Sequence, residues 1–246
     1  MFQNLGEILI LLLKTLAELR NAPRQARKIL DQLFEMGNAS LMMAGILSFF
    51  IGGILALQVA PQMTAHGVTG IVGEVIGLAM CKELAPVMMA VLIIGRIGSS
   101  ITAEIGSMKV YHEIDALQTM NINPVSYLVM PRIVAICIAL PMLVLFSILV
   151  GWVGGLAVSV MNQSAAVTVE GYLASLKAGV DAQEIFEGVF KSVVFALAIG
   201  IISCHQGLIT RGGPRGIGRS VTKSVVNSIA AVLILDYILT RLILFF

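Results

Sequence analysis

Charged side chains interrupt apolar stretches of this chain at four positions, Lys82, Glu83, Lys191 and Asp236. Their surroundings include AMCKELAPVMM for the first two and LILDYIL for the last. A charge at a lipid-facing helix centre costs roughly 2.5 to 3.5 kcal/mol on insertion scales. We therefore expect these groups to face a cavity or one another, which makes them candidates for a functional site. The chemistry that they offer is ion pairing, because the apolar stretches hold no nucleophile beside a base and no catalytic residue is predicted.

Depth in the membrane predicts a pair among these residues. Lys191 lies a few residues into an inward-running helix and Asp236 about fourteen residues into an outward-running one, so both fall in the outer half. We hypothesise that they form an ion pair, or share a polar wall, near the outer mouth of a cavity. The alternative is a buried pair that only sets helix register. Pro86, four residues after Lys82, should loosen the helix there.

Composition sets the fold class. Of the 246 residues, 58% are hydrophobic and 12% are charged, and the mean hydropathy is +0.95, which excludes a water-soluble globule. The apolar runs are continuous rather than alternating, so they predict helices and not membrane strands. We predict an all-α polytopic membrane protein with five transmembrane helices, at about 41–63, 70–100, 127–160, 188–210 and 222–245.

The first forty residues differ in composition from the rest of the chain, because basic residues there are interleaved with leucines. We predict that residues 1–40 form interfacial or elbow helices along the lipid headgroups, ahead of a five-helix domain over 41–246. A secretory signal is disfavoured, since the start carries Glu7 but no Lys or Arg and no small-residue cleavage site follows. A disordered basic tail is the other alternative.

Orientation follows from the cations, which are retained in cytoplasmic loops. The amino-terminal segment, the 104–132 connection and the 211–223 loop are the basic ones, and 61–69 holds no Lys or Arg. The 161–187 connection has Lys177 against an excess of acidic residues. We therefore place the amino terminus in the cytoplasm and the carboxyl terminus outside, with Arg241 reaching the outer interface by snorkelling.

A short amphipathic segment connects the second and third runs. Read as a helix, residues 109–120 place Val110, Ile114 and Leu117 on one side and mostly polar residues on the other, and the pattern stops at Asn123-Pro124. We predict that a helix of this kind, at about 105–123, is a coupling helix to which a soluble partner docks on the membrane domain.

Other patterns point to no site. The three cysteines lie within apolar runs without CxxC spacing, and the three histidines have no ligand spacing, so no metal site is predicted. The stretch from Gly213 to Ser220 approaches a phosphate-loop pattern, but it lacks the strand and helix context that such a loop requires. The frequent glycines indicate close helix packing, and some of them a dimer seam.

Several long motifs together resemble one family. KELAPV (82–87), GRIGSSITAEIGSM (95–108), NINP followed by PR at 131–132, SVVFALAIG (192–200) and GIGRSVTKSVVNSIAAVLILDYILT (216–240) are similar to the MlaE/YrbE permeases. These are membrane subunits of MCE-type ABC transporters, which move phospholipids between the inner membrane and the outer envelope of Gram-negative bacteria. The resemblance implies an inner-membrane permease subunit that serves outer-membrane lipid asymmetry.

The resemblance also implies partners. They are a second copy in a homodimer, cytoplasmic ABC ATPase subunits, a hexameric ring of a periplasmic MCE-domain protein, a STAS-domain protein on the ATPase, and the phospholipid, with no nucleic acid. The chain would be no enzyme and would bind no cofactor, because ATP and Mg²⁺ would lie on the ATPase.

Site residues follow from the same resemblance. Lys82, Glu83 and Leu84 match the family's charged pair beside the lipid cavity, and Lys191 and Asp236 match polar positions near it. Residues implied to couple to the ATPase are Glu104, Lys109, His112, Glu113 and Asp115. Closure of the ATPases would then squeeze an outward-opening cavity with apolar walls and a cationic rim.

Two other classes of function stay open. A secondary transporter or channel could use the buried charges for ion coupling, although no inverted repeat is visible in the sequence. An intramembrane enzyme would need a nucleophile with a base or clustered metal ligands within the spans.

Overall fold

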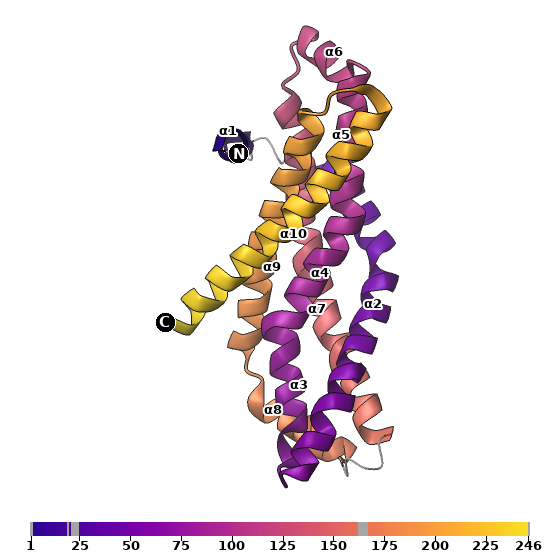
Figure 1. The fold of residues 1–246 in the computed structure, drawn as a ribbon, viewed down its shortest axis with the longest axis vertical. Coiled ribbons are helices and arrows are strands. Elements are labelled where there is room, and N and C mark those ends of the chain that lie inside the picture. Colours follow the sequence, from indigo (N-terminus) through magenta and orange to yellow (C-terminus); the bar gives the residue numbers. More distant parts are fainter. Residues whose placement is uncertain (1, 19, 21–24, 162–166, 246) are drawn as a thin grey trace. The chain divides into compact units, whose positions relative to one another are not determined.

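The computed structural model describes residues 2–18, 20, 25–161 and 167–245, and these form helices and no strand. This confirms the predicted all-α class. Four short helical turns, η2 (Thr69–Ile71), η3 (Met80–Leu84), η4 (Ile94–Gly98) and η5 (Val125–Val129), separate or extend the α-helices. The α-helices are α1 (Phe2–Glu18), α2 (Ala26–Ala65), α3 (Val72–Ala79), α4 (Ala85–Ile93), α5 (Ser99–Val110), α6 (Glu113–Thr119), α7 (Met130–Met161), α8 (Val169–Gly179), α9 (Ala182–Leu208) and α10 (Gly213–Phe245) (Figure 1).

Five helical segments of the described chain are long and apolar enough to cross a membrane, as predicted. All five begin before the predicted runs, because helical hydrogen bonding continues through polar residues that hydropathy excludes, and the fourth ends at Leu208, two residues before its predicted end. The first segment, for example, begins at Ala26 and runs through Arg27, Lys28 and Asp31. The segments are Ala26–Ala65, Thr69–Val110, Val125–Met161, Ala182–Leu208 and Gly213–Phe245.

The chain divides into two compact units. The first contains residues 1–39, 90–140 and 193–246, and the second contains 40–89 and 141–192. The division of the sequence at residue 40 into interfacial helices and a five-helix domain stays a prediction.

Glycines let helices of the second unit approach at backbone distance. A Cβ at Gly52 in α2 would overlap the carbonyl oxygen of Gly151 in α7, and one at Gly154 would meet the carbonyl of Phe49. Nearby, the Ser48 and Ser147 hydroxyls lie 2.6 Å apart. Between neighbouring helices in an apolar setting, small residues permit close packing and hydroxyls supply hydrogen bonds.

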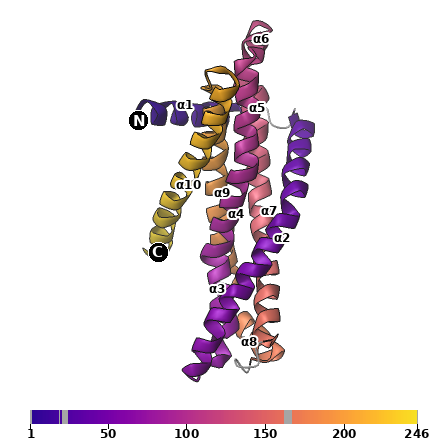
Figure 2. The same cartoon turned by 45° about the vertical axis from the view of Figure 1, so that its right-hand side comes forward.

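A second close contact in this unit joins α3 to α8, which lie side by side in both ribbon views (Figure 1, Figure 2). Gly73 faces the carbonyl oxygen of Tyr172 and the hydroxyl of Ser175, and its N–H donates to that hydroxyl at 3.1 Å. Gly77 leaves room for Leu176. Gly73 and Gly77 therefore serve close helix packing within the chain, as predicted from the frequent glycines; the use of some glycines in a dimer seam stays a prediction.

Hydroxyl groups also join the helices of the first unit. Thr102 of α5 donates to the Ser203 carbonyl of α9 at 3.0 Å, and its hydroxyl lies 2.9 Å from that of Ser224 in α10. Along α10 the buried residues recur every fourth position, at Gly216, Ser220, Ser224, Ser228 and Val232. This row of mostly small residues allows α10 to pack against α5.

Candidate functional site

The most enclosed charge of the second unit is Lys191, whose side chain is only 3% exposed. Its ammonium group lies 2.8 Å from the Glu83 carboxylate, and it donates to the backbone carbonyl of Lys82 at 3.0 Å. A buried ammonium is tolerated only when it is paired and hydrogen-bonded, and these contacts supply both conditions. The structure therefore brings together two of the segments singled out from the sequence, Lys82-Glu83 and Lys191.

The Lys82 carbonyl is available because of a proline. In an α-helix this carbonyl would accept the N–H of residue 86, but Pro86 has none to donate. The helix here is loosened into the π-helical turn η3, in which the Ala85 N–H reaches the carbonyl of Met80, five residues back. The predicted loosening at Pro86 thus coincides with the residues that hold the Lys191 ammonium. π-helical turns of this kind are frequent at functional sites.

A further ion pair lies on the more open side of this cluster. The Lys82 ammonium is 2.7 Å from a Glu184 carboxylate oxygen, and the two side chains are 39% and 22% exposed. Helix α9 comes close enough for this contact because Gly188 faces the backbone carbonyl of Cys81, where any side chain would collide. One turn beyond Glu184, Glu187 accepts a hydrogen bond from Gln183 at 3.3 Å.

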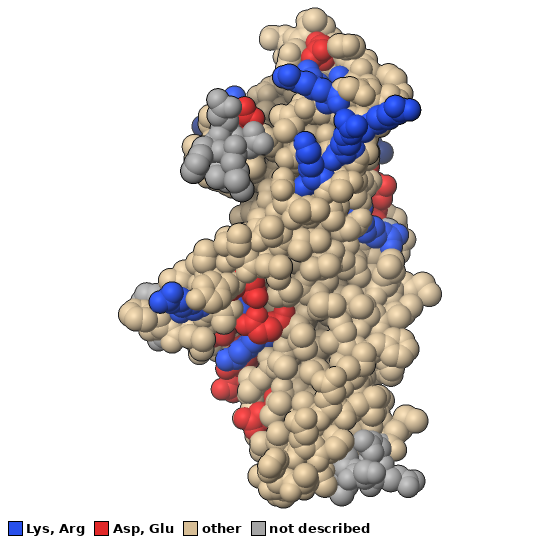
Figure 3. Space-filling model, viewed as in Figure 1, with Lys and Arg blue, Asp and Glu red and all other residues tan. Residues whose placement is uncertain are grey.

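We call Lys82, Glu83, Glu184, Glu187 and Lys191 the charged cluster. Its formal charge is −1, from two ammonium groups and three carboxylates. Figure 3 shows acidic side chains grouped around a basic one over α3 and the start of α9. Each ammonium group of the cluster already contacts a carboxylate. The cluster as it stands is therefore a set of ion pairs, and the cationic rim stays a prediction.

Sequence reasoning missed Glu184 and Glu187, because both were assigned to the 161–187 connection. Helix α9 begins at Ala182, so Glu184 stands in its first turn. The missed signal is the spacing of Glu184, Glu187 and Lys191, which are three and four residues apart and therefore share one helical face.

Two residues of the predicted cavity remain to be placed, Leu84 and Asp236. Leu84 ends η3 and is half-buried. Asp236 is half-buried on α10, which belongs to the first unit. The pairing of Lys191 with Asp236 stays a prediction.

The connection between the second and third spans differs from the predicted helix over 109–120. Helix α5 ends at Val110, His112 has the left-handed φ of 61°, and a separate helix α6 covers Glu113–Thr119. Ile114 is buried at 3% exposure, as its place on the apolar side predicts. The prediction for the polar side is also confirmed, because His112, Glu113 and Thr119 are exposed.

Asp115 holds this bend together. One of its oxygens lies 2.9 Å from the Lys109 ammonium, and the other lies 2.8 Å from Nδ1 of His112. The hydrogen bonds from His112 and Lys109 lower the pKa of the Asp115 carboxyl below its usual value. Of the predicted coupling residues, three therefore form one contact group, while Glu113 stays exposed.

Neutralising Asp115 should loosen this bend. We expect Asp115→Asn to speed exchange of the Ala116 amide, which donates to the His112 carbonyl, by roughly two- to fivefold at pH 7. In the unchanged protein the stabilisation is present above the pKa of the unfolded chain, about 3.9, and is lost as the pH falls through the lower folded value. Hydrogen–deuterium exchange measured from pH 7 to pH 3 checks both the effect of Asp115→Asn and the pH dependence of the unchanged protein. Glu113→Gln is the control, and equal exchange in the two variants would contradict this role.

Glu104, the other predicted coupling residue, lies apart from that group. Its carboxylate contacts the Arg132 guanidinium at 3.0 Å and accepts a hydrogen bond from Ser100 at 2.8 Å. Arg132 also donates to the Leu128 carbonyl at 2.9 Å. These contacts tie α5 to the beginning of α7 at the base of the connection, which gives Glu104 a structural role.

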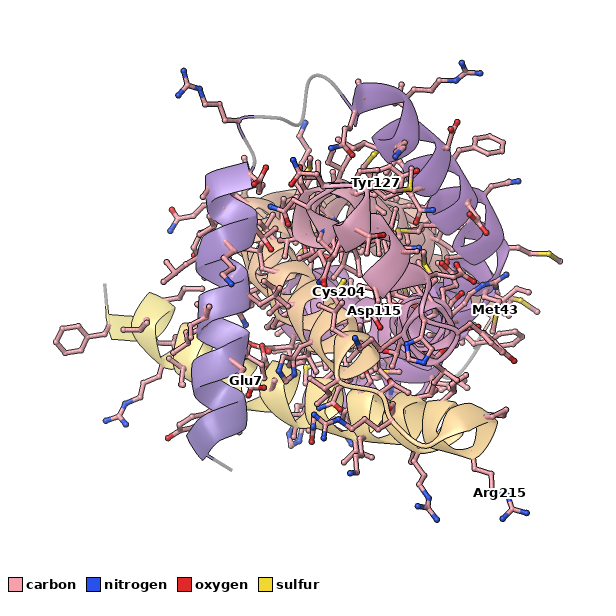
Figure 4. The ribbon with its side chains drawn as sticks, turned by 90° about the horizontal axis from the view of Figure 1, so that it is seen from above. Glu7, Met43, Asp115, Tyr127, Cys204 and Arg215 are labelled. Carbon is pink, nitrogen blue, oxygen red and sulfur yellow. The ribbon has the colours of Figure 1, made fainter. Side chains whose placement is uncertain are left out.

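The first unit carries two further features, of which the sequence singled out only the basic 211–223 segment. Glu7 of α1 lies 3.1 Å from Nε2 of the buried His205 on α9, and Figure 4 shows Glu7 on the inner side of α1. At the start of α10, Arg215, Arg219 and Lys223 are exposed on one helical face, where Figure 3 shows basic side chains gathered. Figure 4 shows Arg215 extending outward.

Comparison with known proteins identifies relatives of this chain among membrane transporters. A family model described as Permease MlaE matches residues 29–242. The "Probable ABC transporter permease protein" of Synechocystis sp. is 39% identical over 216 residues, which cover 88% of this chain and 81% of the relative. That of Rickettsia typhi is 34% identical over 241 residues, covering 98% and 92%. "Protein TRIGALACTOSYLDIACYLGLYCEROL 1, chloroplastic" of Arabidopsis thaliana is 32% identical over 235 residues, covering 96% of this chain and 65% of that protein. The chain is therefore a multi-pass membrane protein that belongs to the MlaE family of ABC transporter permeases.

Proposed function

We propose that this chain is the permease subunit of an ATP-driven transporter that moves phospholipids between the inner membrane and the periplasm or outer membrane. The observation that carries the proposal is the charged cluster, since a buried ammonium held by Glu83 and a loosened helix makes a polar site within a membrane span. The Arabidopsis relative bears the name of a membrane glycolipid, which supports a lipid as the cargo. In a bacterium, this activity would maintain the lipid asymmetry of the outer membrane.

The chain's own contribution is binding and shape rather than bond chemistry. Apolar helix surfaces accommodate acyl chains, and the charged cluster receives the polar headgroup. ATP hydrolysis takes place on the ATPase partner that an ABC transporter permease requires. We further propose a homodimer, a periplasmic ring of MCE-domain protein and a STAS-domain protein on the ATPase, with the amino terminus of this chain in the cytoplasm. Support for that orientation is the basic start of α10.

Coupling to the ATPase would run through α6. Its surroundings expose Tyr111 at 63% and Met120 at 70%, beside the exposed carboxylate of Glu113. Exposed tyrosine and methionine side chains are typical of a protein interface. The Asp115 contacts hold α6 at the end of α5, so a push on α6 is passed to the second span.

Reconstitution tests the proposed function. The chain is placed in vesicles with its ATPase, and the movement of a fluorescent phospholipid to an acceptor is measured with ATP and with a non-hydrolysable analogue. We expect movement with ATP only. Lipid movement by the chain alone along an ion gradient would instead support a secondary transporter, and ion current without lipid movement would support a channel.

The assignment of α6 as the docking element for the ATPase makes a separate prediction. Glu113→Lys inverts an exposed charge on α6, and we expect it to weaken copurification of the ATPase by about tenfold, because charge reversal at a docking surface opposes association. The matched control is Glu170→Lys, the same change at an exposed position in the first turn of α8. Measurement is the ATPase-to-permease ratio after affinity purification from detergent. If both variants retain the ATPase equally, α6 is not the docking element.

A further inference from the structure

We propose that the Lys82–Glu184 ion pair selects phospholipids whose headgroup carries both a phosphate and an amine over phospholipids with a net negative headgroup. This inference rests on the proposed function and names the class of lipid that the same site prefers. Lys82 is 39% exposed and Glu184 22%, whereas in the other pair Glu83 is 41% exposed but its partner Lys191 is enclosed at 3%. A headgroup phosphate that reaches the cluster therefore meets the Lys82 ammonium before it meets that of Lys191.

The geometry allows a zwitterionic headgroup to join this pair. The Lys82 ammonium has three N–H groups and meets Glu184 at 2.7 Å, so a phosphate can accept from another N–H and then lies close to the Glu184 carboxylate. A headgroup amine can donate to that carboxylate. Each of the four charges then has an opposite charge beside it in a medium of low dielectric constant.

An anionic headgroup lacks the amine. Its phosphate shares the Lys82 ammonium with Glu184, whose side chain is three-quarters or more buried, and it brings no cation to offset the repulsion between phosphate and carboxylate. Two negative groups beside one ammonium are unfavourable where the dielectric constant is low. Two different lipids thus make the same phosphate contact and differ in whether the Glu184 carboxylate gains a second cation.

The rest of the charged cluster also favours a zwitterionic headgroup over an anionic one. Its formal charge of −1 repels an added negative charge and leaves a zwitterion unaffected in net charge. Glu187 stands one turn after Glu184 on the same face of α9 and is half-buried, which places a second acceptor within reach of an amine. Lys191 is occupied by Glu83 and the Lys82 carbonyl.

The test is the lipid composition that the assembled transporter retains. The permease with its ATPase is purified from bilayers containing equal amounts of phosphatidylethanolamine and phosphatidylglycerol, and the bound lipids are counted by mass spectrometry. We expect enrichment of phosphatidylethanolamine by about tenfold, the factor that corresponds to a modest difference in pairing. In Glu184→Gln, which keeps the size of the side chain and removes its charge, the enrichment should fall to within about twofold of the bilayer ratio.

The matched control is Glu170→Gln, which removes an exposed carboxylate on α8 and should leave the enrichment unchanged. A second measurement needs no variant: soluble glycerophosphoethanolamine should displace bound lipid from the unchanged complex better than glycerophosphoglycerol does. Equal retention of both lipids, equal displacement by both headgroups, or unchanged enrichment in Glu184→Gln would each overturn the inference while leaving lipid transport intact. Absence of any bound or transported lipid would instead overturn the proposed function itself.

Discussion

Replacing Lys191 with methionine is expected to lower both the stability of the protein and its ATP-driven lipid movement, the latter by at least about tenfold. Methionine has nearly the same length as lysine, so the main loss is the ammonium group. Without it, the Glu83 carboxylate and the Lys82 carbonyl lose a partner that they contact at 2.8 Å and 3.0 Å. Removing one member of a buried pair typically destabilises a protein by about 3 to 5 kcal/mol. Because Glu83 is 41% exposed and can regain some solvation, we expect a value near the lower end.

The double variant Lys191→Met, Glu83→Met separates pairing from packing. It removes both charges together, so the Glu83 carboxylate is not left without its ammonium, and we expect it to unfold at a higher temperature than Lys191→Met alone. Thermal unfolding in detergent, followed by circular dichroism, gives the midpoints of the unchanged protein, both single variants and the double variant. Additive losses in the double variant would show that Lys191 and Glu83 do not interact. Lipid movement should not recover, because the double variant still lacks the ammonium group.

Hydropathy was sufficient to find the five spans and the charges within them, because both depend only on local composition. It could not assign partners to those charges. Lys82 and Glu184 are about one hundred positions apart in the sequence, and their contact depends on the approach of α9 at Gly188. Lys191 lies within the fourth candidate span, but the depth count compared only residues already recognised as intramembrane. Glu184 and Glu187 fell outside that comparison because hydropathy located the start of α9 too late.

The segment between the second and third spans also shows what a local sequence pattern can and cannot predict. Its amphipathic pattern identified Ile114 as buried and Glu113 as exposed, since periodicity reports which side of a helix is apolar. The pattern did not reveal the break at His112, where one residue in the left-handed region separates α5 from α6. Helical periodicity is nearly unchanged by a bend of one or two residues. The contacts of Asp115 with Lys109 before the bend and with His112 at the bend are what hold it in place.

Replacing Gly52 with alanine should produce the largest loss of stability available from a single added methyl group in the second unit. The new Cβ would overlap the carbonyl oxygen of Gly151, a backbone atom that no change of rotamer can move. Helices α2 and α7 would have to separate locally, and the hydrogen bond between the Ser48 and Ser147 hydroxyls, at 2.6 Å, would lengthen. Overpacking of this kind typically costs about 1 to 3 kcal/mol, which exceeds the gain in helix propensity from glycine to alanine.

The same helix offers a matched control. Gly37 also lies in α2, and a Cβ there would meet no atom within 4 Å among the residues that the structure describes. Gly37→Ala should therefore raise stability by up to about 1 kcal/mol, since alanine is the better helix former. The opposite signs of the two changes can be measured as unfolding midpoints in detergent, under one protocol for both proteins. Similar midpoints for Gly52→Ala and Gly37→Ala would mean that α2 and α7 do not approach at backbone distance. A loss confined to Gly52→Ala would instead establish that the glycine pattern of this family member is required for packing within a single chain, whatever it contributes between two copies.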